Sequence, residues 1–276
     1  MQPVYFCFAH GAGSSAMSFA TLIKHLKDAC AENKTSAGFL AMDYRGHGET
    51  GFTVSSKEQI EDYSLATMCD DFTECMTAAL EVVAEAKPVS CILVGHSLGG
   101  SIVTTVAQMG ALPSCNAFVV LDVVEGTALD ALHSTSQILK QRPASFADMS
   151  EAIGWALSSR IISNQVSARS SIPALLRRSP ESKRLLWRHD WKPTQAYWQS
   201  WFQDLSRKFL SASRSLGKLL ILAGTDRLDK PLMIAQMQGA FQMNVIPGAG
   251  HFVHEDEPCK VAHIIAAFAD RFGKSL

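Results

Sequence analysis

The sequence predicts an α/β protein in which a mostly parallel sheet is flanked by helices. Short apolar runs alternate with longer stretches of helical periodicity, a rhythm typical of βαβ units. The apolar runs are continuous rather than alternating, as expected for strands that are buried on both faces. With 276 residues, of which 47% are hydrophobic, the chain is long enough to form a sizeable core.

The expected strands cover residues 3–9, 37–42, 89–95, 116–122, 218–223 and 243–247. Residues 64–86 carry apolar side chains at helical spacing, with Ser64 as the N-cap. A last helix is expected from Pro258 to Phe272. Residues 125–216 contain helical stretches and no run that predicts a strand. We therefore expect a single domain, 1–276, with a helical cap inserted over the carboxyl edge of the sheet.

Composition excludes several classes of function. Lys and Arg number 25 against 26 Asp and Glu, which argues against a nucleic-acid partner. No run of about 18 apolar residues predicts a membrane span, and the N-terminal residues MQPVYFCFAHG are typical of a strand rather than a signal peptide. Seven scattered cysteines without a CxxC pair favour a reducing compartment, cytoplasmic or nuclear, and no metal site.

The cap has a charge of its own. Residues 160–214 contain eleven Arg and Lys against three Asp and Glu, although the whole chain has a net charge of −1. Such a segment is either a solvated helical face or a surface that steers an acidic partner. The pattern alone leaves both readings open.

A nucleophile is predicted in LVGHSLGGS, residues 93–101, where glycines lie two positions before and two after Ser97. The motif follows an apolar run and precedes a helical pattern, which is the context of the nucleophile elbow in the α/β-hydrolase fold. In such a turn the Ser97 hydroxyl lies above the sheet edge, and the amide of Leu98 points towards a developing oxyanion. The alternative is a glycine-rich turn with an idle serine.

FAHGAGSS, residues 8–15, is expected to supply the second oxyanion-hole amide, that of Ala12. We expect His10 to brace this loop rather than to transfer protons. His47, in the glycine-rich turn MDYRGHGET, is also expected to be structural. The chain begins at the strand that carries His-Gly, so the N-terminal antiparallel strands of the full fold are not expected in it.

The general base and its acid should follow later strands. NVIPGAGHFVHEDEP offers His251, approached through two glycines, while His254 opens an acidic helix start and is expected to cap or pack there. The acid is either Asp122, at the end of the strand after the elbow, or Asp226 in AGTDRLDK. Both aspartates precede His251, and the strands that they follow end at the same edge of the sheet, so spacing does not choose between them.

Five blocks together resemble the protein phosphatase methylesterase family: DVVEGTALDAL (122–132), RPASF (142–146), AGTDRLDK (223–230), MQGAFQM (237–243) and GHFVHEDEP (250–258). The resemblance runs from about Val4 to Phe272 and assigns the triad acid to the aspartate of DVVEG, Asp122. It implies a serine carboxylesterase without metal or organic cofactor. The implied substrate is the methyl ester on the C-terminal leucine of the catalytic subunit of a type 2A protein phosphatase. The chain departs from the family in reading HGAG for HGGG and in lacking a long acidic cap insertion.

The cap gains a role from this resemblance, because a phosphatase tail presents acidic and aromatic residues. We expect Arg184, Arg188 and Trp198 to bind it, within a cluster that also contains Trp187, Trp191, Tyr197 and Trp201. The alternative is that these aromatic residues pack the cap's own helices. Two other functions stay open: a general hydrolase of small esters, thioesters or C–C bonds, and a non-catalytic module that binds the phosphatase.

Overall fold

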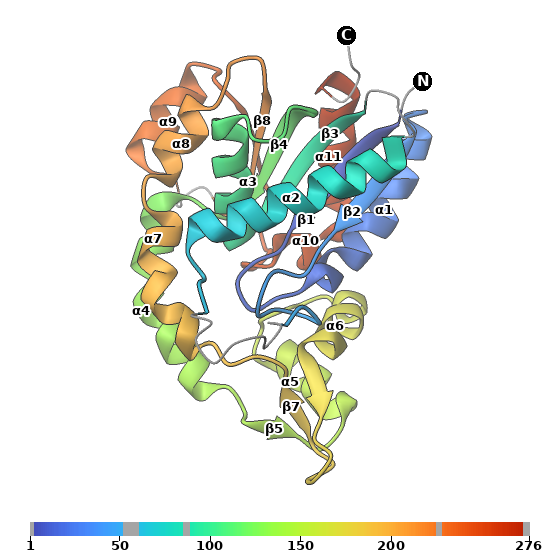
Figure 1. Ribbon diagram of the computed structural model, residues 1–276, viewed down its shortest axis with the longest axis vertical. Coiled ribbons are helices and arrows are strands. Elements are labelled where there is room, and N and C mark those ends of the chain that lie inside the picture. Colours follow the sequence, from blue (N-terminus) through green and yellow to red (C-terminus); the bar gives the residue numbers. More distant parts are fainter. Residues whose placement is uncertain (1–2, 52–60, 85–88, 225–227, 273–276) are drawn as a thin grey trace.

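The six predicted strands form one parallel sheet. The computed structural model describes residues 3–51, 61–84, 89–224 and 228–272, and its strands lie in the order β2-β1-β3-β4-β8-β9 (Figure 1). Every neighbouring pair is parallel. The strands are β1 (Val4–Ala9), β2 (Ala37–Ala41), β3 (Ser90–His96), β4 (Cys115–Leu121), β8 (Gly217–Leu222) and β9 (Gln242–Val245). The predicted strands are thereby confirmed, with shifts of only one or two residues at their ends.

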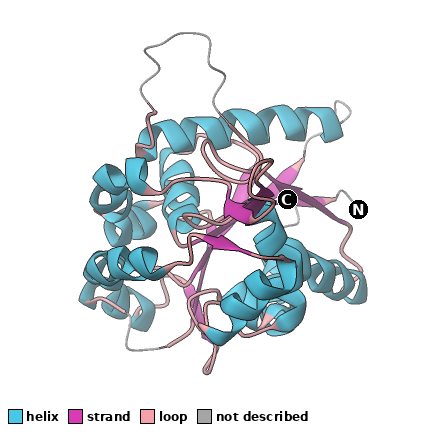
Figure 2. Cartoon of the chain, turned by 90° about the horizontal axis from the view of Figure 1, so that it is seen from below, coloured by secondary structure: helices cyan, strands magenta, loops and turns pink. Residues whose placement is uncertain are grey.

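Helices cover both faces of this sheet (Figures 1 and 2). Side chains of β3 alternate between two apolar cores, Cys91 and Leu93 on one face and Ile92 and Val94 on the other. Burial on both faces explains why this strand reads as a continuous apolar run. The first core includes α2 (Leu65–Ala84), α3 (Leu98–Met109), α8 (Leu205–Ser211) and α9 (Lys230–Met237); the second includes α1 (Ala20–Glu32) and α11 (Pro258–Phe272).

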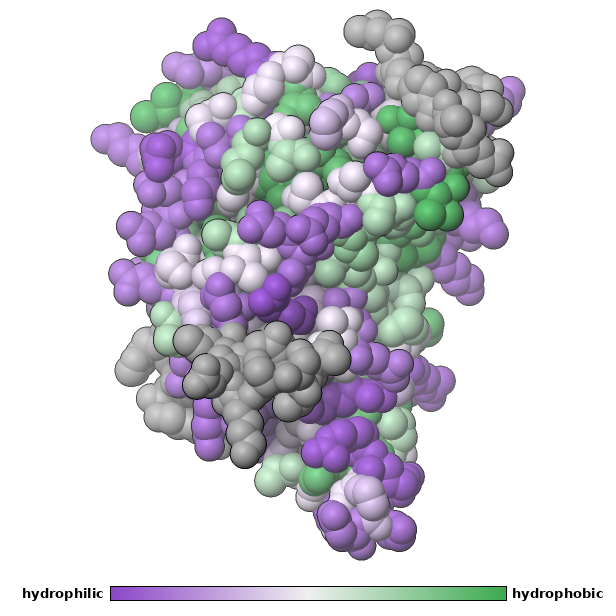
Figure 3. All heavy atoms as spheres, viewed as in Figure 1, coloured by the Kyte–Doolittle hydropathy of each residue, from purple (hydrophilic) through white to green (hydrophobic). Residues whose placement is uncertain are grey.

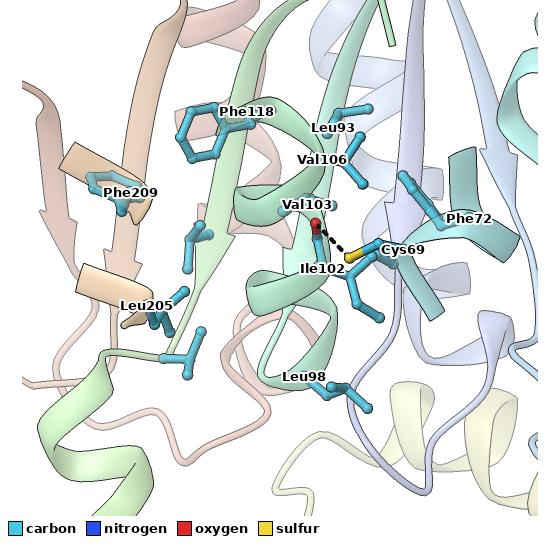
Figure 4. Packing of buried hydrophobic residues seen from close by; sticks show 14 of the residues in the cluster. Cys69, Phe72, Leu93, Leu98, Ile102, Val103, Val106, Phe118, Leu205 and Phe209 are labelled. Carbon is cyan, nitrogen blue, oxygen red and sulfur yellow. Dashed lines mark hydrogen bonds between the residues drawn. The ribbon is translucent and has the colours of Figure 1, made fainter. Parts of the chain in front are cut away.

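The first core holds α3, which follows the elbow, between α2 and α8 (Figure 4). On one side the Cys69 thiol of α2 lies 3.8 Å from the Ile102 carbonyl oxygen. On the other, Phe118 of β4 meets Phe209 of α8 edge to face, with ring centroids 5.3 Å apart. Truncating a buried phenylalanine costs about 3–5 kcal/mol of unfolding free energy, so packing of this kind is a large part of the stability of this core.

The cap lies at the carboxyl edge of the sheet, below it in Figure 1. It contains the expected helices, but the prediction that it holds no strand is wrong. Three short strands form a separate antiparallel sheet in the order β5-β7-β6. They are β5 (Ser145–Phe146), β6 (Leu176–Arg178) and β7 (Leu185–Trp187). Strands of two or three residues are too short to show a periodicity, so no pattern predicted them.

The cap packs around a small core of its own, which includes Phe146, Ile162 and Leu185. Its lower tip, the β6–β7 hairpin, is covered mostly with hydrophilic side chains (Figure 3). The cap helices are α4 (Glu125–Gln141), α5 (Met149–Ser158), α6 (Gln165–Ser171) and α7 (Trp198–Phe202), with 3₁₀ turns at Ile172–Leu175 and Lys192–Tyr197. Outside the cap, a 3₁₀ turn at Ala16–Phe19 precedes α1, and α10 (Val253–Asp256) precedes α11. Among the described residues, no helix is long and apolar enough to cross a membrane.

Candidate active site

Ser97 occupies a strained turn between β3 and α3. Its backbone has φ 52° and ψ −118°, a region that residues with a side chain rarely adopt. The flanking glycines are required by close packing. A Cβ on Gly95 would lie 2.1 Å from the carbonyl oxygen of Gly99, and one on Gly99 would lie 1.9 Å from that of Ala9. The turn therefore has the geometry of a nucleophile elbow, and it fixes Ser97 against the end of β1.

Two backbone amides are available beside Ser97. Leu98 is the first residue of α3, so its N–H has no acceptor within the helix. The Ala12 N–H donates to no acceptor among the described residues, and Ala12 lies in the wall of the same cavity as Ser97. Its neighbour Gly11 packs closely, since a Cβ there would lie 3.3 Å from the Cβ of Ser97. These are the two amides that the sequence predicts for an oxyanion hole.

His10 braces the loop that carries Ala12, as expected. The Tyr44 N–H donates to His10 Nε2 at 3.2 Å, so Nδ1 carries the proton and donates to the Gly11 carbonyl at 2.8 Å. Burial lowers the pKa of His10 to about 4, which keeps the ring neutral. His47 is buried in the adjoining turn, and burial lowers its pKa to about 3. Both rings hold loops in place and are too deeply buried to exchange protons with a substrate.

Asp122 and His251, the predicted acid and base, lie within hydrogen-bonding distance of each other. Asp122 directly follows β4, with φ 48°, and its carboxylate is fully buried. One carboxylate oxygen lies 3.0 Å from His251 Nδ1, and the other accepts a hydrogen bond from the Ala223 N–H at 2.8 Å. These hydrogen bonds hold the carboxylate, which orients the imidazole so that Nε2 faces away from it. Asp226, the other candidate acid, lies outside the described residues.

A buried histidine supports the loop of His251 from behind. His96, the last residue of β3, donates from Nε2 to the His251 carbonyl at 2.9 Å. Burial and the neighbouring histidines lower the pKa of His96 well below its usual value. His254 packs against it with ring centroids 4.4 Å apart, and burial lowers the pKa of His254 to about 3. His254 is thus a packing residue, as the sequence indicated.

Asp256 ties the same loop to the cap. One of its carboxylate oxygens accepts from the Gly250 N–H, immediately before His251, and the other from the Ser163 N–H of the cap, both at 2.7 Å. Hydrogen bonds to a charged acceptor are stronger than those between neutral groups. The position of the imidazole is thereby coupled to the position of the cap. The sequence indicated an acidic helix start here but not this bridge.

A cavity of about 590 Å³ separates the sheet edge from the cap. Ser97 and His251 lie in its floor, and its walls are mostly apolar and aromatic, with Trp155, Trp187, Trp191, Trp198, Trp201 and Phe202 among them. Within the described chain the Ser97 hydroxyl makes no hydrogen bond, so the serine–histidine contact is not closed in this state. The arrangement can position a nucleophile, a base with its orienting acid, and two oxyanion donors around one enclosed space.

The predicted substrate-binding residues divide between the cavity and the surface. Trp198 lies in the cavity wall, buried, with its indole N–H bonded to the Thr194 hydroxyl. Arg184, in the β6–β7 hairpin, donates a hydrogen bond to the Ser145 hydroxyl of β5, and Arg188 forms an ion pair with Glu49 at 3.2 Å. Neither arginine lines the cavity. Their binding of a substrate tail stays a prediction.

Two other arginines, Arg142 and Arg160, do line the cavity, and sequence reasoning missed both. Arg142 stands in the RPASF block that carried the resemblance, yet nothing in the pattern assigned it a place in the site. The available signal was its position at the end of the predicted insertion's first helix. That signal does not say which way the side chain points.

Comparison with known proteins places this site in a family. The chain matches the family model described as "Alpha/beta hydrolase family" over residues 8–264. Protein phosphatase methylesterase 1 of Aspergillus oryzae is 43% identical over 277 residues, 98% of this chain and 64% of that protein. The protein of the same name from Schizosaccharomyces pombe is 43% identical over 262 residues, 95% of this chain and 73% of that protein. The chain belongs to the protein phosphatase methylesterase family of alpha/beta hydrolases.

The chain therefore spans 64% of the length of its Aspergillus oryzae relative. Among solved structures, E-2-(acetamidomethylene)succinate hydrolase superposes with a TM-score of 0.72 over 98% of this chain and 92% of its own. Its sequence is 21% identical, so this likeness supports the fold alone. The predicted α/β-hydrolase fold and the predicted family are both confirmed.

Proposed function

We propose that the protein is a serine carboxylesterase that removes the methyl ester from the C-terminal leucine of the catalytic subunit of a type 2A protein phosphatase. The relatives at 43% identity carry the name protein phosphatase methylesterase, which supports the reaction class. The observation that carries the proposal is structural. Ser97 and the Asp122–His251 pair open into one cavity with free amides beside the serine.

In the first step His251 Nε2 takes the proton of the Ser97 hydroxyl as its oxygen attacks the ester carbonyl carbon. The carbonyl electron pair moves onto its oxygen, which the amides of Ala12 and Leu98 stabilise. Asp122 holds the imidazole in the tautomer that leaves Nε2 free to accept, and it stabilises the imidazolium that forms. Removing one oxyanion donor of this kind typically costs about 10²–10³ in kcat.

The tetrahedral intermediate then collapses. The bond to the methoxy oxygen breaks, His251 returns its proton to that oxygen, and methanol leaves an acyl-enzyme on Ser97. Water attacks the acyl carbon with His251 again as the base. The products are a free leucine carboxylate and the original serine. No metal or organic cofactor is needed for these steps.

The open serine–histidine contact is compatible with this mechanism. Catalytic hydrogen bonds are often long in the absence of substrate and shorten in the bound complex. His251 is 47% exposed, so its ring has room to turn towards Ser97. Asp256 links the loop of His251 to the cap, so a substrate that moves the cap also moves the base, His251.

The size and lining of the cavity suit the proposed substrate. At about 590 Å³ it lies within the range that binds ligands of several hundred daltons. Its aromatic walls favour apolar side chains, such as that of the terminal leucine. A carboxymethylated tail would enter with its ester at Ser97 and its upstream residues between the cap tryptophans.

The direct test is to incubate the protein with the carboxymethylated phosphatase catalytic subunit and to follow release of the methyl group. We expect release by the parent and, for Ser97→Ala, a loss of about 10⁴-fold or more with an unchanged Tm. The control is a p-nitrophenyl ester. If the parent cleaves this ester but releases no methyl from the phosphatase, the site is that of a general esterase and the substrate assignment is wrong.

A further inference from the structure

A half-buried cation, Arg142, faces the cavity that contains Ser97. Arg142 follows α4 directly, and its guanidinium lies 3.5 Å from the ring centroid of Trp187 and 6.0 Å from that of Trp191. Stacking on an aromatic face stabilises the cation but uses none of its hydrogen-bond donors. The N–H groups of a guanidinium lie in its plane, so they remain available for a ligand.

The cation has no carboxylate partner within the described residues. No hydrogen bond or ion pair joins the Arg142 guanidinium to another group there, and no Asp or Glu lies among the described residues that line the cavity. Arg45, Arg188 and Arg207 differ in this respect, since each pairs with a carboxylate. Arg142 is the one of these four whose charge faces an enclosed space.

Burial makes this charge costly unless a ligand compensates it. Desolvation lowers the pKa of Arg142 to about 10, so the side chain stays protonated at neutral pH. A partly desolvated charge without a partner gains more from an incoming opposite charge than an exposed one does. Arg160, the other arginine of the cavity lining, is exposed and is therefore better hydrated.

We propose that Arg142 is a specificity-determining residue that binds a carboxylate of the peptide held in the cavity. The inference rests on the proposed function, because it takes the ligand to be a peptide whose C-terminal ester reaches Ser97. The carboxylate has two sources in such a ligand. One is an acidic side chain upstream of the ester, and the other is the α-carboxylate that hydrolysis releases. Both would accept two N–H bonds from the planar guanidinium.

The first arm of the test uses six-residue peptides that end in leucine methyl ester and carry one Asp at each upstream position in turn. Each is compared with the matching Asn peptide. For the parent we expect at least one position at which Asp raises kcat/KM by about tenfold over Asn. In Arg142→Gln that Asp-to-Asn ratio should fall to about one, whatever the absolute rate. A ratio within one variant is insensitive to a general loss of activity.

The second arm measures inhibition by the free-acid product peptide without acidic side chains. For each protein, inhibition by this free-acid peptide is compared with inhibition by the same peptide as its C-terminal amide. If the released carboxylate is the ligand, the acid-to-amide ratio of inhibition should be about tenfold higher for the parent than for Arg142→Gln. Arg142→Lys keeps the charge but not the planar pair of donors, and should retain only part of either effect.

Two variants serve as controls. Arg177→Gln removes the same charge from the exposed hairpin, and should keep the parent's Asp-to-Asn ratio. Arg160→Gln removes the exposed charge at the cavity. If Arg160→Gln abolishes the ratio while Arg142→Gln retains it, the carboxylate subsite is not at Arg142.

The outcomes separate this inference from the proposed function. If the parent does not hydrolyse any leucine methyl ester peptide or the methylated phosphatase, the proposed function fails first. If it hydrolyses them, but neither arm distinguishes the parent from Arg142→Gln, the proposed function stands and Arg142 is only a stacking residue of the cap.

Discussion

Two regions meet at the cavity, and they differ in what holds the residues beside it. At the sheet edge, Ser97 and Asp122 both have positive φ, and Gly99 packs directly on the backbone of β1. Such conformations cost about 1–3 kcal/mol each and persist only where the surrounding core determines them. The cap instead rests on two- and three-residue strands and a hydrophilic hairpin.

The two regions therefore have different functions in the proposed reaction. The sheet edge holds the groups whose positions must be exact to a fraction of an ångström for bond making. The cap supplies the aromatic walls of the cavity and the two arginines that line it. Asp256 connects the two, because its carboxylate bonds to the cap at Ser163 and to the loop of His251 at Gly250. The variants below change one region at a time, or the hydrogen bonds that connect the two.

The largest effect is expected at the sheet edge. Asp122→Asn should lower kcat by about 10⁴-fold on every ester, because an amide in this place favours the wrong imidazole tautomer. The matched variant is Asp226→Asn, which should keep most of the activity. Rates on a p-nitrophenyl ester and on the methylated phosphatase would check both. If Asp226→Asn is the inactive variant, the acid has been assigned to the wrong strand end.

Cutting the bridge between the regions should have a smaller effect. Asp256→Ala removes both hydrogen bonds and should lower kcat by roughly 10- to 100-fold, with a smaller change in KM, because the imidazole loop loses its anchor. Asp256→Asn keeps only one acceptor oxygen and should fall between the parent and Asp256→Ala. A variant with parental kcat and a lower Tm would assign Asp256 to stability alone.

The pH dependence of the unfolding free energy should report on Glu255, the neighbour of Asp256. Burial raises the pKa of Glu255 to about 8, so the folded protein binds its proton more tightly than the unfolded chain does. The contribution of Glu255 to the unfolding free energy should therefore fall as the pH rises from about 4.5 to about 8, by at most about 1.4 kcal/mol per unit. The buried histidines His10, His47, His96 and His254 have lowered pKa values, so around pH 6.5 the unfolded chain binds more protons at these positions than the folded protein does. They therefore add a slope of opposite sign, which fades as the pH rises above about 7.5.

Urea unfolding of the parent and of Glu255→Gln between pH 6.5 and 8 would measure the contribution of Glu255. The glutamine resembles the protonated acid and leaves the histidines in place, so the unfolding free energy of the parent minus that of the variant should fall as the pH rises. An equal slope in both proteins would show that another group titrates in this window.

The smallest effect is expected on the outer face of the cap. Charge reversal at Arg184 and Arg188 should lower activity on the intact phosphatase by roughly 3- to 10-fold, through weaker attraction of an acidic tail. Activity on a small neutral ester should hardly change, because neither side chain lines the cavity. Equal losses on both substrates would indicate damage to the fold instead of a lost contact.

The two regions also differed in how far the sequence predicted them. Every strand of the main sheet was predicted, because burial on both faces produces a continuous apolar run such as CILVG. The elbow around Ser97 was predicted because close packing requires glycines at fixed positions. The cap strands were missed, since two or three residues show no period.

The same limit applies to the site. Spacing offered Asp122 and Asp226 equally, and only the resemblance favoured Asp122. Its contact with His251 depends on the register of β4 and on a loop 129 residues later, which no local pattern records. Arg142 and Asp256 were missed for a related reason: their roles depend on which way a side chain points across a cavity or between two loops.

We propose above that Ser97 is an activated nucleophile in a cavity that receives a leucine methyl ester. The most direct measurement is the rate of covalent labelling by a fluorophosphonate, with the site mapped by mass spectrometry. We expect a single label on Ser97, labelling that slows when a peptide ending in leucine methyl ester is present, and none in Ser97→Ala. An absence of labelling at Ser97 in the folded parent protein would contradict the account and favour a non-catalytic module.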